Sequence, residues 1–358
     1  MNKKIIIGNK MISKYTPTFI VAEMSANHNM DFERAKAIIK GVKDAGADAI
    51  KLQTYTADTI TIDCDNDYFQ ITQGTLWDGM TLHKLYEKAY TPWEWQPKLK
   101  EYAESLGLIC FSSPFDFTSV DFLETMNVPA YKIASFEITD IPLIRKIARL
   151  GKPIFISTGI AYLKDIELAL RTCVEEGNNN IILLKCTSTY PSPYKDMNIE
   201  TITALENTFN CLIGLSDHSM GYTVPIAAIA KGAKVIEKHV TIRRNDGGPD
   251  SEFSMELQEF KEMCKQIRIA EAAIGEVTFD LTEAQKRERE HSRSLFVVKD
   301  IKCGETFTSD NIKSIRPGFG LHTKYYNQII GKKARCDIKK GTPLKWEIIE
   351  SVSYTHLT

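Results

Sequence analysis

The feature that most constrains the fold of this chain is a series of eight short apolar runs separated by amphipathic segments. Runs of this length, rich in β-branched residues, are typical of strands buried on both faces. The segments between them repeat apolar residues at helical spacing; in one, Ala35, Ile38 and Val42 lead to Gly46, a helix-ending residue. The runs lie at 19–22, 49–52, 108–111, 130–134, 153–156, 181–184, 211–215 and 234–236.

The alternation of strands and helices predicts βαβ units and a parallel sheet. Eight such strands match a closed (β/α)₈ TIM barrel of the α/β class, which we place at residues 1–275. A doubly wound open sheet is the alternative. Its dinucleotide-binding form needs G-x-G-x-x-G after the first strand, where this chain has residues Glu23 to Asn29 without a glycine.

The chain changes character after residue 275. Residues 276–292 are strongly charged and predict a solvated linker. Residues 293–351 carry short β-like runs and a local repeat, Asp300-Ile301-Lys302-Cys303-Gly304 and Asp337-Ile338-Lys339-Lys340-Gly341, which indicates a small β-rich domain with two similar halves. Residues 352–358 resemble a translated sequencing adapter, so we interpret them as an artefactual tail.

Composition excludes several classes of function. The net charge of −1 provides no general field for nucleic acid, and no apolar run approaches the roughly 20 residues of a membrane-spanning helix. The apolar run near Met1 is too short for a signal peptide. The eight cysteines form no C-x-x-C pair and indicate mostly buried thiols in a reducing compartment. We therefore expect a soluble cytoplasmic protein.

Polar residues follow each predicted strand, at the barrel face where active sites occur. His218 and His239 end the seventh and eighth strands, which would be neighbours about 4.8 Å apart. Two imidazoles there predict a metal site with open positions for water and substrate. The alternative is a pair of histidines satisfied by hydrogen bonds at the strand ends.

Three lysines, Lys51, Lys132 and Lys185, also end predicted strands. A lysine at such a place requires an anion, and with Ser135, Ser188 and Ser216 the lysines predict a pocket for phosphate and carboxylate. The alternatives are lysines that extend outward to solvent and a Schiff-base lysine.

Two carboxylates and one long segment complete the candidate site. Glu23 ends the first strand and is either a general base or a hydrogen-bond partner of a histidine. Asp250 lies on the loop after the eighth strand, either as a turn residue or as a catalytic carboxylate. The connection at 56–91 is long for a βα loop, and such loops are often functional lids.

These motifs resemble the sialic-acid synthase family over nearly the whole chain. The matching motifs include Lys51-x-Gln53, Tyr131-Lys132-Ile133-x-Ser135, Ser157-Thr158-Gly159, Cys186-Thr187-x-x-Tyr190-Pro191, Gly214-Leu215-Ser216-Asp217-His218, Glu237-Lys238-His239, Gly248-Pro249-Asp250 and Arg316-Pro317-Gly318. Within the family, Leu76-Trp77-Asp78 and the leucine at position 52 favour the pseudaminic branch. Leu52 and Ser188 replace the histidine and asparagine usual in the neuraminic branch, which makes the phosphate-binding role of Ser188 less certain.

The resemblance implies a (β/α)₈ barrel followed by an antifreeze-like (SAF) domain. It also implies a transferase that condenses phosphoenolpyruvate with 2,4-diacetamido-2,4,6-trideoxy-L-altrose to a nine-carbon acid and releases phosphate by C–O cleavage. A divalent ion, Mn²⁺, Mg²⁺ or Co²⁺, would be held by His218 and His239, while Glu23 and Asp250 would be catalytic. Substrate would be bound by Lys51, Gln53, Ser113, Lys132, Ser135, Ser157, Ser188, Tyr190, Ser216 and Arg316.

The resemblance further implies a domain-swapped homodimer in which the SAF domain caps the partner's barrel. The alternatives within the family are synthases of N-acetylneuraminate or legionaminate. Outside it, they are a Schiff-base aldolase on the same barrel and a non-catalytic carbohydrate-binding protein built on the SAF domain.

Overall fold

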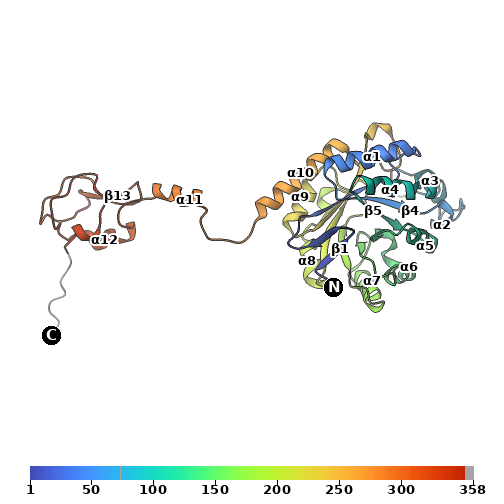
Figure 1. Cartoon of the computed structure of the whole chain (residues 1–358), viewed down its shortest axis with the longest axis horizontal. Coiled ribbons are helices and arrows are strands. Elements are labelled where there is room, and N and C mark those ends of the chain that lie inside the picture. Colours follow the sequence, from blue (N-terminus) through green and yellow to red (C-terminus); the bar gives the residue numbers. More distant parts are fainter. Residues whose placement is uncertain (73, 351–358) are drawn as a thin grey trace. The chain divides into compact units, whose positions relative to one another are not determined.

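The computed structural model describes residues 1–72 and 74–350, so the predicted tail at 352–358 lies outside the described residues. The chain divides into two compact units, one from Met1 to Gly275 and one from Glu276 onward. The first unit contains the strands and helices of a barrel (Figure 1). No helix in the described ranges is long and apolar enough to cross a membrane.

The first unit is a closed barrel of eight parallel strands, as predicted. Strands β3 to β9 pair in chain order, and β10 pairs with both β9 and β3 to close the circle. Most strands extend beyond the apolar runs because their polar last residues also join the ladder. The strands are β3 (Phe19–Glu23), β4 (Ala49–Thr54), β5 (Ile109–Pro114), β6 (Tyr131–Ile133), β7 (Ile154–Ser157), β8 (Ile181–Cys186), β9 (Leu212–Asp217) and β10 (Val235–Thr241).

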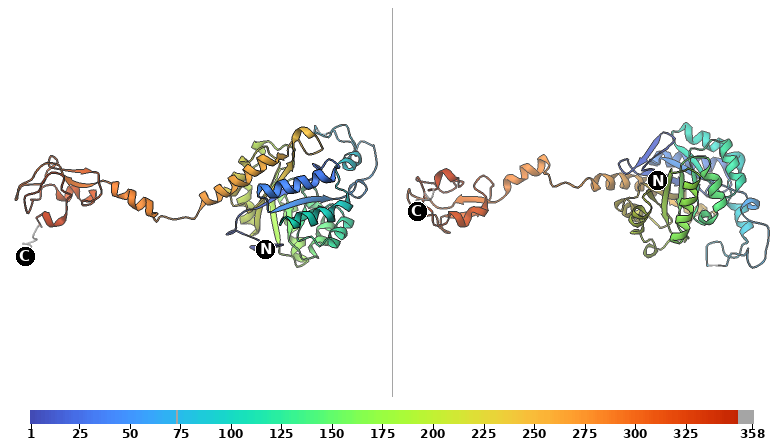
Figure 2. Two further views of the ribbon diagram at one scale, coloured as in Figure 1. Left: turned by 45° about the horizontal axis from the view of Figure 1, so that its top comes forward. Right: turned by 90° about the horizontal axis from the view of Figure 1, so that it is seen from below.

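Helices surround the barrel, and two views show them around the strands (Figure 2). They are α1 (Phe32–Ala45), α2 (Ala57–Ile60), α3 (Leu82–Ala89), α4 (Gln96–Ser105), α5 (Phe117–Thr125), α6 (Ile141–Ala148), α7 (Leu163–Glu175), α8 (Thr201–Phe209), α9 (Thr223–Ala230) and α10 (Leu257–Ile274). Helix α1 begins at the Asp31 cap and ends at Gly46, whose φ of 98° is left-handed, as the sequence predicts.

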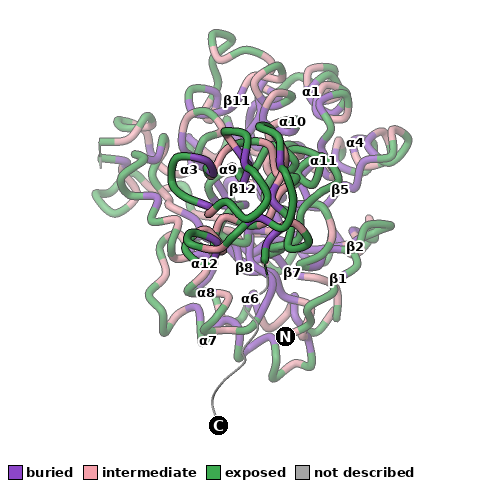
Figure 3. The backbone as a smooth tube through the Cα atoms, turned by 90° about the vertical axis from the view of Figure 1, so that its left-hand side faces the viewer, coloured by how far each residue is buried: buried purple, intermediate pink, exposed green. Residues whose placement is uncertain are grey.

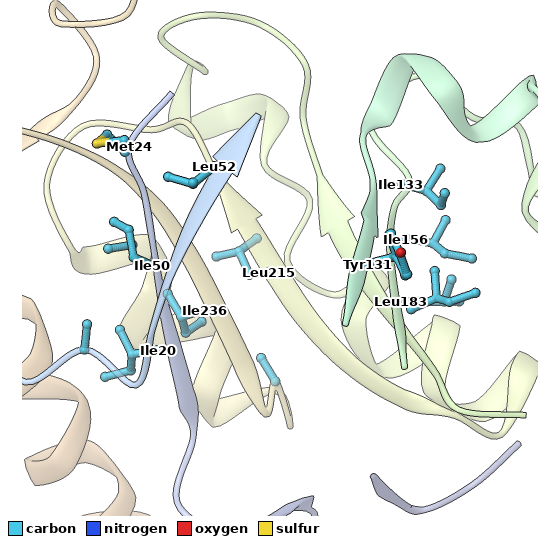
Figure 4. Close-up of a cluster of buried hydrophobic side chains, with 14 of the residues drawn as sticks. Ile20, Met24, Ile50, Leu52, Tyr131, Ile133, Ile156, Leu183, Leu215 and Ile236 are labelled. Atoms are coloured by element: carbon cyan, nitrogen blue, oxygen red, sulfur yellow. The ribbon is translucent and has the colours of Figure 1, made fainter. Parts of the chain in front are cut away.

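A continuous apolar layer joins the strands to the helices. Strand residues such as Ile20, Ile50 and Leu215 point away from the barrel axis into this layer (Figure 4). Helices α1 and α10 approach closely at Gly41, where a Cβ atom would lie 2.4 Å from the Leu257 side chain. Buried residues follow the strands and the inner helix faces, coloured purple in Figure 3.

An N-terminal hairpin closes the lower end of the barrel, a feature the sequence interpretation did not include. Strands β1 (Lys4–Ile7) and β2 (Lys10–Ser13) pair antiparallel. Ile5, Ile7 and Ile12 are buried against the apolar lower interior, which includes Phe111 and Phe155. The hairpin therefore covers the end of the barrel opposite the C-terminal ends of the strands.

The second unit has its own core around Leu295, Phe307 and Leu344. Strands β12 (Ser294–Val297) and β13 (Ile312–Ile315) pair antiparallel, and further β pairing of the described residues takes the form of isolated bridges. The unit also contains α11 (Glu283–Glu288) and α12 (Tyr326–Ile329), with residues 276–293 exposed throughout.

The two copies of the local repeat face each other. Ile301 bridges to Ile338 between them. Lys302 forms an ion pair with Asp337 at 2.7 Å, and Lys339 forms its counterpart with Asp300 at 2.8 Å. The repeat is thus reciprocal in space as well as in sequence.

All eight cysteines are unpaired. Five are buried, as expected, but Cys303 and Cys336 are exposed on the second unit and Cys64 is half-buried. Cys303 lies in a turn and Cys336 in a bend of the small second unit, where the backbone faces solvent.

Candidate active site

The barrel interior changes from apolar to polar along the strands. Successive side chains of a strand alternate between two faces, so residues two apart share the interior. On β3, for example, Phe19 and Val21 lie in the lower core and Glu23 follows above them. The same alternation places these buried or half-buried residues in the upper interior: Glu23, Lys51, Gln53, Ser113, Lys132, Ser157, Cys186, Ser216, His218, Glu237 and His239.

Two lysines and two carboxylates form a buried cluster there. Lys51 Nζ forms an ion pair with Glu23 and lies 3.8 Å from Glu237 Oε1. Lys132 Nζ lies 3.5 Å from the same Glu237 oxygen. Burial lowers the pKa of Lys51 to about 7, because the lost hydration outweighs the attraction of Glu237 and the charge of Lys132 adds to the effect.

Hydroxyl groups border this cluster. Ser216 Oγ donates to Glu237 Oε1 at 2.9 Å, and Lys51 Nζ donates to Ser113 Oγ at 3.3 Å. The side chain of Ser157 is buried, and its Oγ has no hydrogen-bond partner within the described ranges. A buried hydroxyl in this position is available to a ligand.

A second group of hydroxyls surrounds Gly159, which follows β7. Ser188 Oγ donates to Ser135 Oγ at 2.8 Å, and Ser135 Oγ accepts from the Ile160 amide at 3.0 Å. A Cβ atom at position 159 would lie 2.1 Å from Ser188 Oγ and 2.6 Å from Ser135 Oγ. The glycine therefore keeps open the space into which both hydroxyls point.

His218 and His239 lie together, with their ring centroids 5.3 Å apart. The Thr187 carbonyl accepts from His218 Nδ1 at 3.0 Å, so a neutral ring carries its lone pair on Nε2. His239 Nδ1 is buried without a partner among the described residues. Burial and the neighbouring positive charges hold the pKa of His239 well below its usual value.

These two rings fit an open metal site. Both can supply a neutral nitrogen, and a protein carbonyl fixes the orientation of one. No group of three or more His, Cys, Asp or Glu side chains with metal-binding spacing occurs among the described residues. An ion held here would thus have two protein nitrogens and would complete its coordination with water or substrate.

Asp250 and Tyr190 lie on loops above the histidines. The Asp250 carboxylate accepts from Ser25 Oγ, and burial raises its pKa. The Tyr190 ring lies 4.5 Å from the His218 ring. Gln53 lies beside Ser113 in the β4–β5 register. Arg316 is exposed on the second unit, directly after β13.

The structure corrects one prediction about the lysines. Lys185 has the opposite parity to Cys186 and turns away from the interior, where its Nζ donates to the Cys186 carbonyl and to Thr187 Oγ1 at 2.8 and 2.6 Å. The upper interior therefore contains two of the three predicted lysines, Lys51 and Lys132. The alternation of side chains along the strand could have predicted this, because Lys185 is one position away from the inward-facing Cys186.

The structure also adds a residue that the sequence interpretation missed. Glu137 lies two residues after Ser135 in a short 3₁₀ turn, and its Oε2 is buried without a partner in the described part of the chain. Burial raises the pKa of Glu137 to about 7, although Lys132 and Lys51 oppose the change. It is a carboxyl group able to gain or lose a proton near neutral pH.

Fold and site together define a (β/α)₈-barrel enzyme whose mouth collects lysines, carboxylates, hydroxyls and two imidazoles. The chain belongs to the NeuB family, whose model matches residues 38–279, and residues 292–350 match the SAF domain.

Known proteins of similar sequence and structure span almost the whole chain. Pseudaminic acid synthase of Campylobacter jejuni subsp. jejuni serotype O:2 is 47% identical over 339 residues, which cover 95% of this chain and 98% of that protein. N,N'-diacetyllegionaminic acid synthase of the same organism is 37% identical over 330 residues, covering 90% and 97%. The crystal structure of the spore coat polysaccharide biosynthesis protein spsE of Bacillus subtilis matches with a TM-score of 0.66 and 34% identity, covering 97% and 99%.

Proposed function

We propose that this chain is a pseudaminic acid synthase, which condenses phosphoenolpyruvate with 2,4-diacetamido-2,4,6-trideoxy-L-altrose and releases phosphate. The observation that carries the proposal is the buried cluster in which Lys51 and Lys132 converge on Glu237 inside a NeuB-family barrel. The greater identity to the pseudaminic than to the legionaminic synthase of one organism favours this sugar over its stereoisomer.

Phosphoenolpyruvate would occupy the upper barrel interior. Its carboxylate and phosphate need cations and hydroxyl donors, which Lys51, Lys132, Ser113 and Ser216 supply there. Ser135, Ser188 and Ser157 would add hydroxyl contacts around Gly159. The incoming anion would also stabilise the Lys51 ammonium group, whose pKa burial lowers.

His218 and His239 would hold a divalent ion such as Mn²⁺, Mg²⁺ or Co²⁺. When bound, such an ion polarises the carbonyl of the open-chain sugar. The protein contributes the fixed orientation of His218 through Thr187 and the neutral state of His239. Removing either imidazole is expected to weaken Mn²⁺ binding measured by calorimetry as well as turnover, and wild-type Mn²⁺ affinity in His218→Ala or His239→Ala would exclude that residue.

The carboxylates Glu23 and Asp250 would transfer the protons of the reaction. In the reaction, C3 of phosphoenolpyruvate bonds to the aldehyde carbon, whose oxygen takes a proton, and water adds to C2. The C2–O bond then breaks, phosphate leaves with the remaining hydroxyl proton, and a keto group forms. Glu23, paired with Lys51, is the proposed acceptor of the water proton, and Asp250 is the second catalytic carboxylate.

We also propose a domain-swapped homodimer in which Arg316 of one subunit reaches the sugar in the other. Large apolar side chains are exposed at the C-terminal face of the barrel, after β5, β6 and β7. Their exposure to water in a monomer would be unfavourable. They are Phe117, Phe136, Ile160, Tyr162 and Leu163, each at least 46% exposed. A partner's small domain would cover them.

The unpaired cysteines agree with a cytoplasmic location.

A Schiff-base aldolase remains a second candidate because of one observation, the lowered pKa of Lys51. The decisive experiment incubates the protein with phosphoenolpyruvate, Mn²⁺ and each candidate sugar, and measures phosphate release and product mass. Phosphate released in equal amount to a nine-carbon acid supports the synthase. In a parallel incubation with pyruvate, a lysine adduct trapped by borohydride, together with no phosphate release from phosphoenolpyruvate, would establish the aldolase instead.

A further inference from the structure

The segment between β4 and α4 is long, and backbone hydrogen bonds join described residues on either side of Trp77. Ile71 N donates to the Met80 carbonyl at 2.9 Å, and Leu82 N donates to the Phe69 carbonyl at 2.9 Å. Next to Trp77 in the sequence, the Asp78 carboxylate accepts from Thr75 N and Thr75 Oγ1, both at 2.8 Å. These hydrogen bonds therefore hold the backbone on both sides of Trp77.

Trp77 contacts the loop that carries Asp250. Its indole Nε1 donates to the Pro249 carbonyl at 2.9 Å, across 172 positions of sequence. On its other side the same loop is held by the β3–α1 connection, where Asn29 Nδ2 donates to the Gly247 carbonyl at 2.9 Å and Ser25 donates to the Asp250 carboxylate. Gly247 and Gly248 have φ values of 72° and 120°, so the loop between these anchors has a backbone that other residues rarely adopt.

Trp77 also contacts the loop that carries Tyr190. Their ring centroids are 5.8 Å apart. Tyr190 in turn packs on His218 at 4.5 Å and on Phe253 at 5.1 Å. One half-buried side chain from the long segment thus touches both loops that overhang the two histidines.

We propose that Trp77 is a positioning residue for the sugar, and that through it the segment 56–91 sets the geometry of Asp250 and Tyr190. This inference rests on the proposed function. Among the groups proposed for phosphoenolpyruvate, Ser188 shares a loop with Tyr190. The lysines and the other serines lie on strand ends and on the β6–α6 connection, and Trp77 forms no described hydrogen bond or ring pair with any of them. Loss of the indole should therefore affect the sugar more than phosphoenolpyruvate, which only the loop of Ser188 links to Trp77.

The size of the effect follows from the two contacts. A neutral hydrogen bond contributes about 0.5–1.5 kcal/mol, which corresponds to roughly a 2- to 10-fold change in an affinity or rate. An aromatic pair adds a comparable amount. Trp77→Phe keeps a ring against Tyr190 but removes the donor to Pro249, whereas Trp77→Ala removes both.

The experiment measures phosphate release while one substrate is varied and the other is saturating. For Trp77→Ala we expect the sugar KM to rise at least about 10-fold, with the phosphoenolpyruvate KM within about 2-fold of wild type. Trp77→Phe should lie between wild type and Trp77→Ala. Tyr68→Ala is the matched control, because Tyr68 is an aromatic residue of the same segment that is 90% exposed.

Each outcome decides one question. Equal changes in both KM values, or a wild-type sugar KM in Trp77→Ala, would overturn the inference while leaving the proposed function intact. If Trp77→Ala does not fold, the same comparison is made with Trp77→Phe, whose thermal midpoint should match that of wild type. A wild-type protein that releases no phosphate with this sugar would overturn the proposed function, and the inference with it.

Discussion

At the scale of single residues, His28 links two loops at the top of the barrel. Its Nδ1 accepts from Met30 N at 3.1 Å, and its Nε2 lies 3.1 Å from Thr91 Oγ1. Both ring nitrogens are thus used by a neutral imidazole. Burial, with help from Arg34, lowers the pKa of His28 to about 4.

This low pKa predicts a loss of stability in mild acid. His28 takes up a proton below about pH 6.5 in the unfolded state but only below about pH 4 in the folded state. Its contribution to the free energy of unfolding is therefore complete above about pH 6.5 and is lost as the pH falls from about 6.5 to about 4. Between pH 7.5 and 5 we expect the free energy of unfolding to fall about 2 kcal/mol more in wild type than in His28→Gln. Urea unfolding at both pH values is the measurement; parallel losses would contradict the assignment.

Gly159 provides a second prediction at this scale. Gly159→Ala places a methyl group where Ser188 and Ser135 hydroxyls point. We expect the phosphoenolpyruvate KM to rise about 10-fold and stability to fall by about 1–3 kcal/mol, a typical cost of overpacking. Steady-state kinetics and thermal unfolding test this, with Lys164→Ala, an exposed change on the following helix, as the control. Unchanged phosphoenolpyruvate kinetics would remove this serine group from the pocket.

Single residues also show how far sequence reasoning reaches into a site. Lys51, His218 and Glu23 could be placed at the upper end of the barrel because a polar residue directly after an apolar run is recognisable in the sequence. Lys185 was misplaced although its strand was correct, because one position of register separates the interior from the helix layer. Glu137 was missed because it belongs to a turn, where no periodicity shows which way a side chain points.

At the scale of elements, β9 and β10 are joined by a buried ion pair on their outer side. Lys238 Nζ lies 2.6 Å from Asp217 Oδ2, and both side chains are at most 1% exposed. Asp217 also accepts from Ser219 N at 2.9 Å, and Lys238 donates to the Ser219 carbonyl. The pair therefore fixes the backbone on both sides of His218.

Removing one partner should cost more than removing both. We expect Lys238→Met to lower the free energy of unfolding by about 3–5 kcal/mol, because the buried Asp217 carboxylate loses its cationic partner. The double variant Asp217→Leu with Lys238→Met should recover part of that loss, since no charge is left unpaired. Denaturant unfolding of the full cycle measures both, and additive losses would show that the pair is not coupled.

Strands were the most predictable elements of this fold. Their apolar runs are long enough to distinguish them from the amphipathic segments between them, and the helix over residues Phe32–Ala45 ends at the glycine expected. The hairpin β1–β2 was not predicted. Its four-residue strands carry little pattern by themselves and acquire their structure by covering the apolar barrel end.

At the scale of the whole molecule, the swapped dimer can be tested by complementation. His218→Ala removes a barrel function and Arg316→Ala removes a function of the second unit, so each homodimer should be nearly inactive. After unfolding and refolding together, half of the dimers would be mixed and each would contain one intact site, giving about a quarter of wild-type activity. If mass spectrometry confirms mixed dimers and activity does not recover, Arg316 acts in the site of its own subunit.

The reciprocal ion pairs of the second unit have a consequence for how that unit is organised. Two segments of similar sequence contact each other through Asp300–Lys339 and Asp337–Lys302, so the same ion pair occurs twice with the roles exchanged. This is the pattern of an isologous dimer interface, here contained within one polypeptide. Neither half can bury its own apolar face without the other, and the unit should fold and unfold as a fused pair, with no stable half.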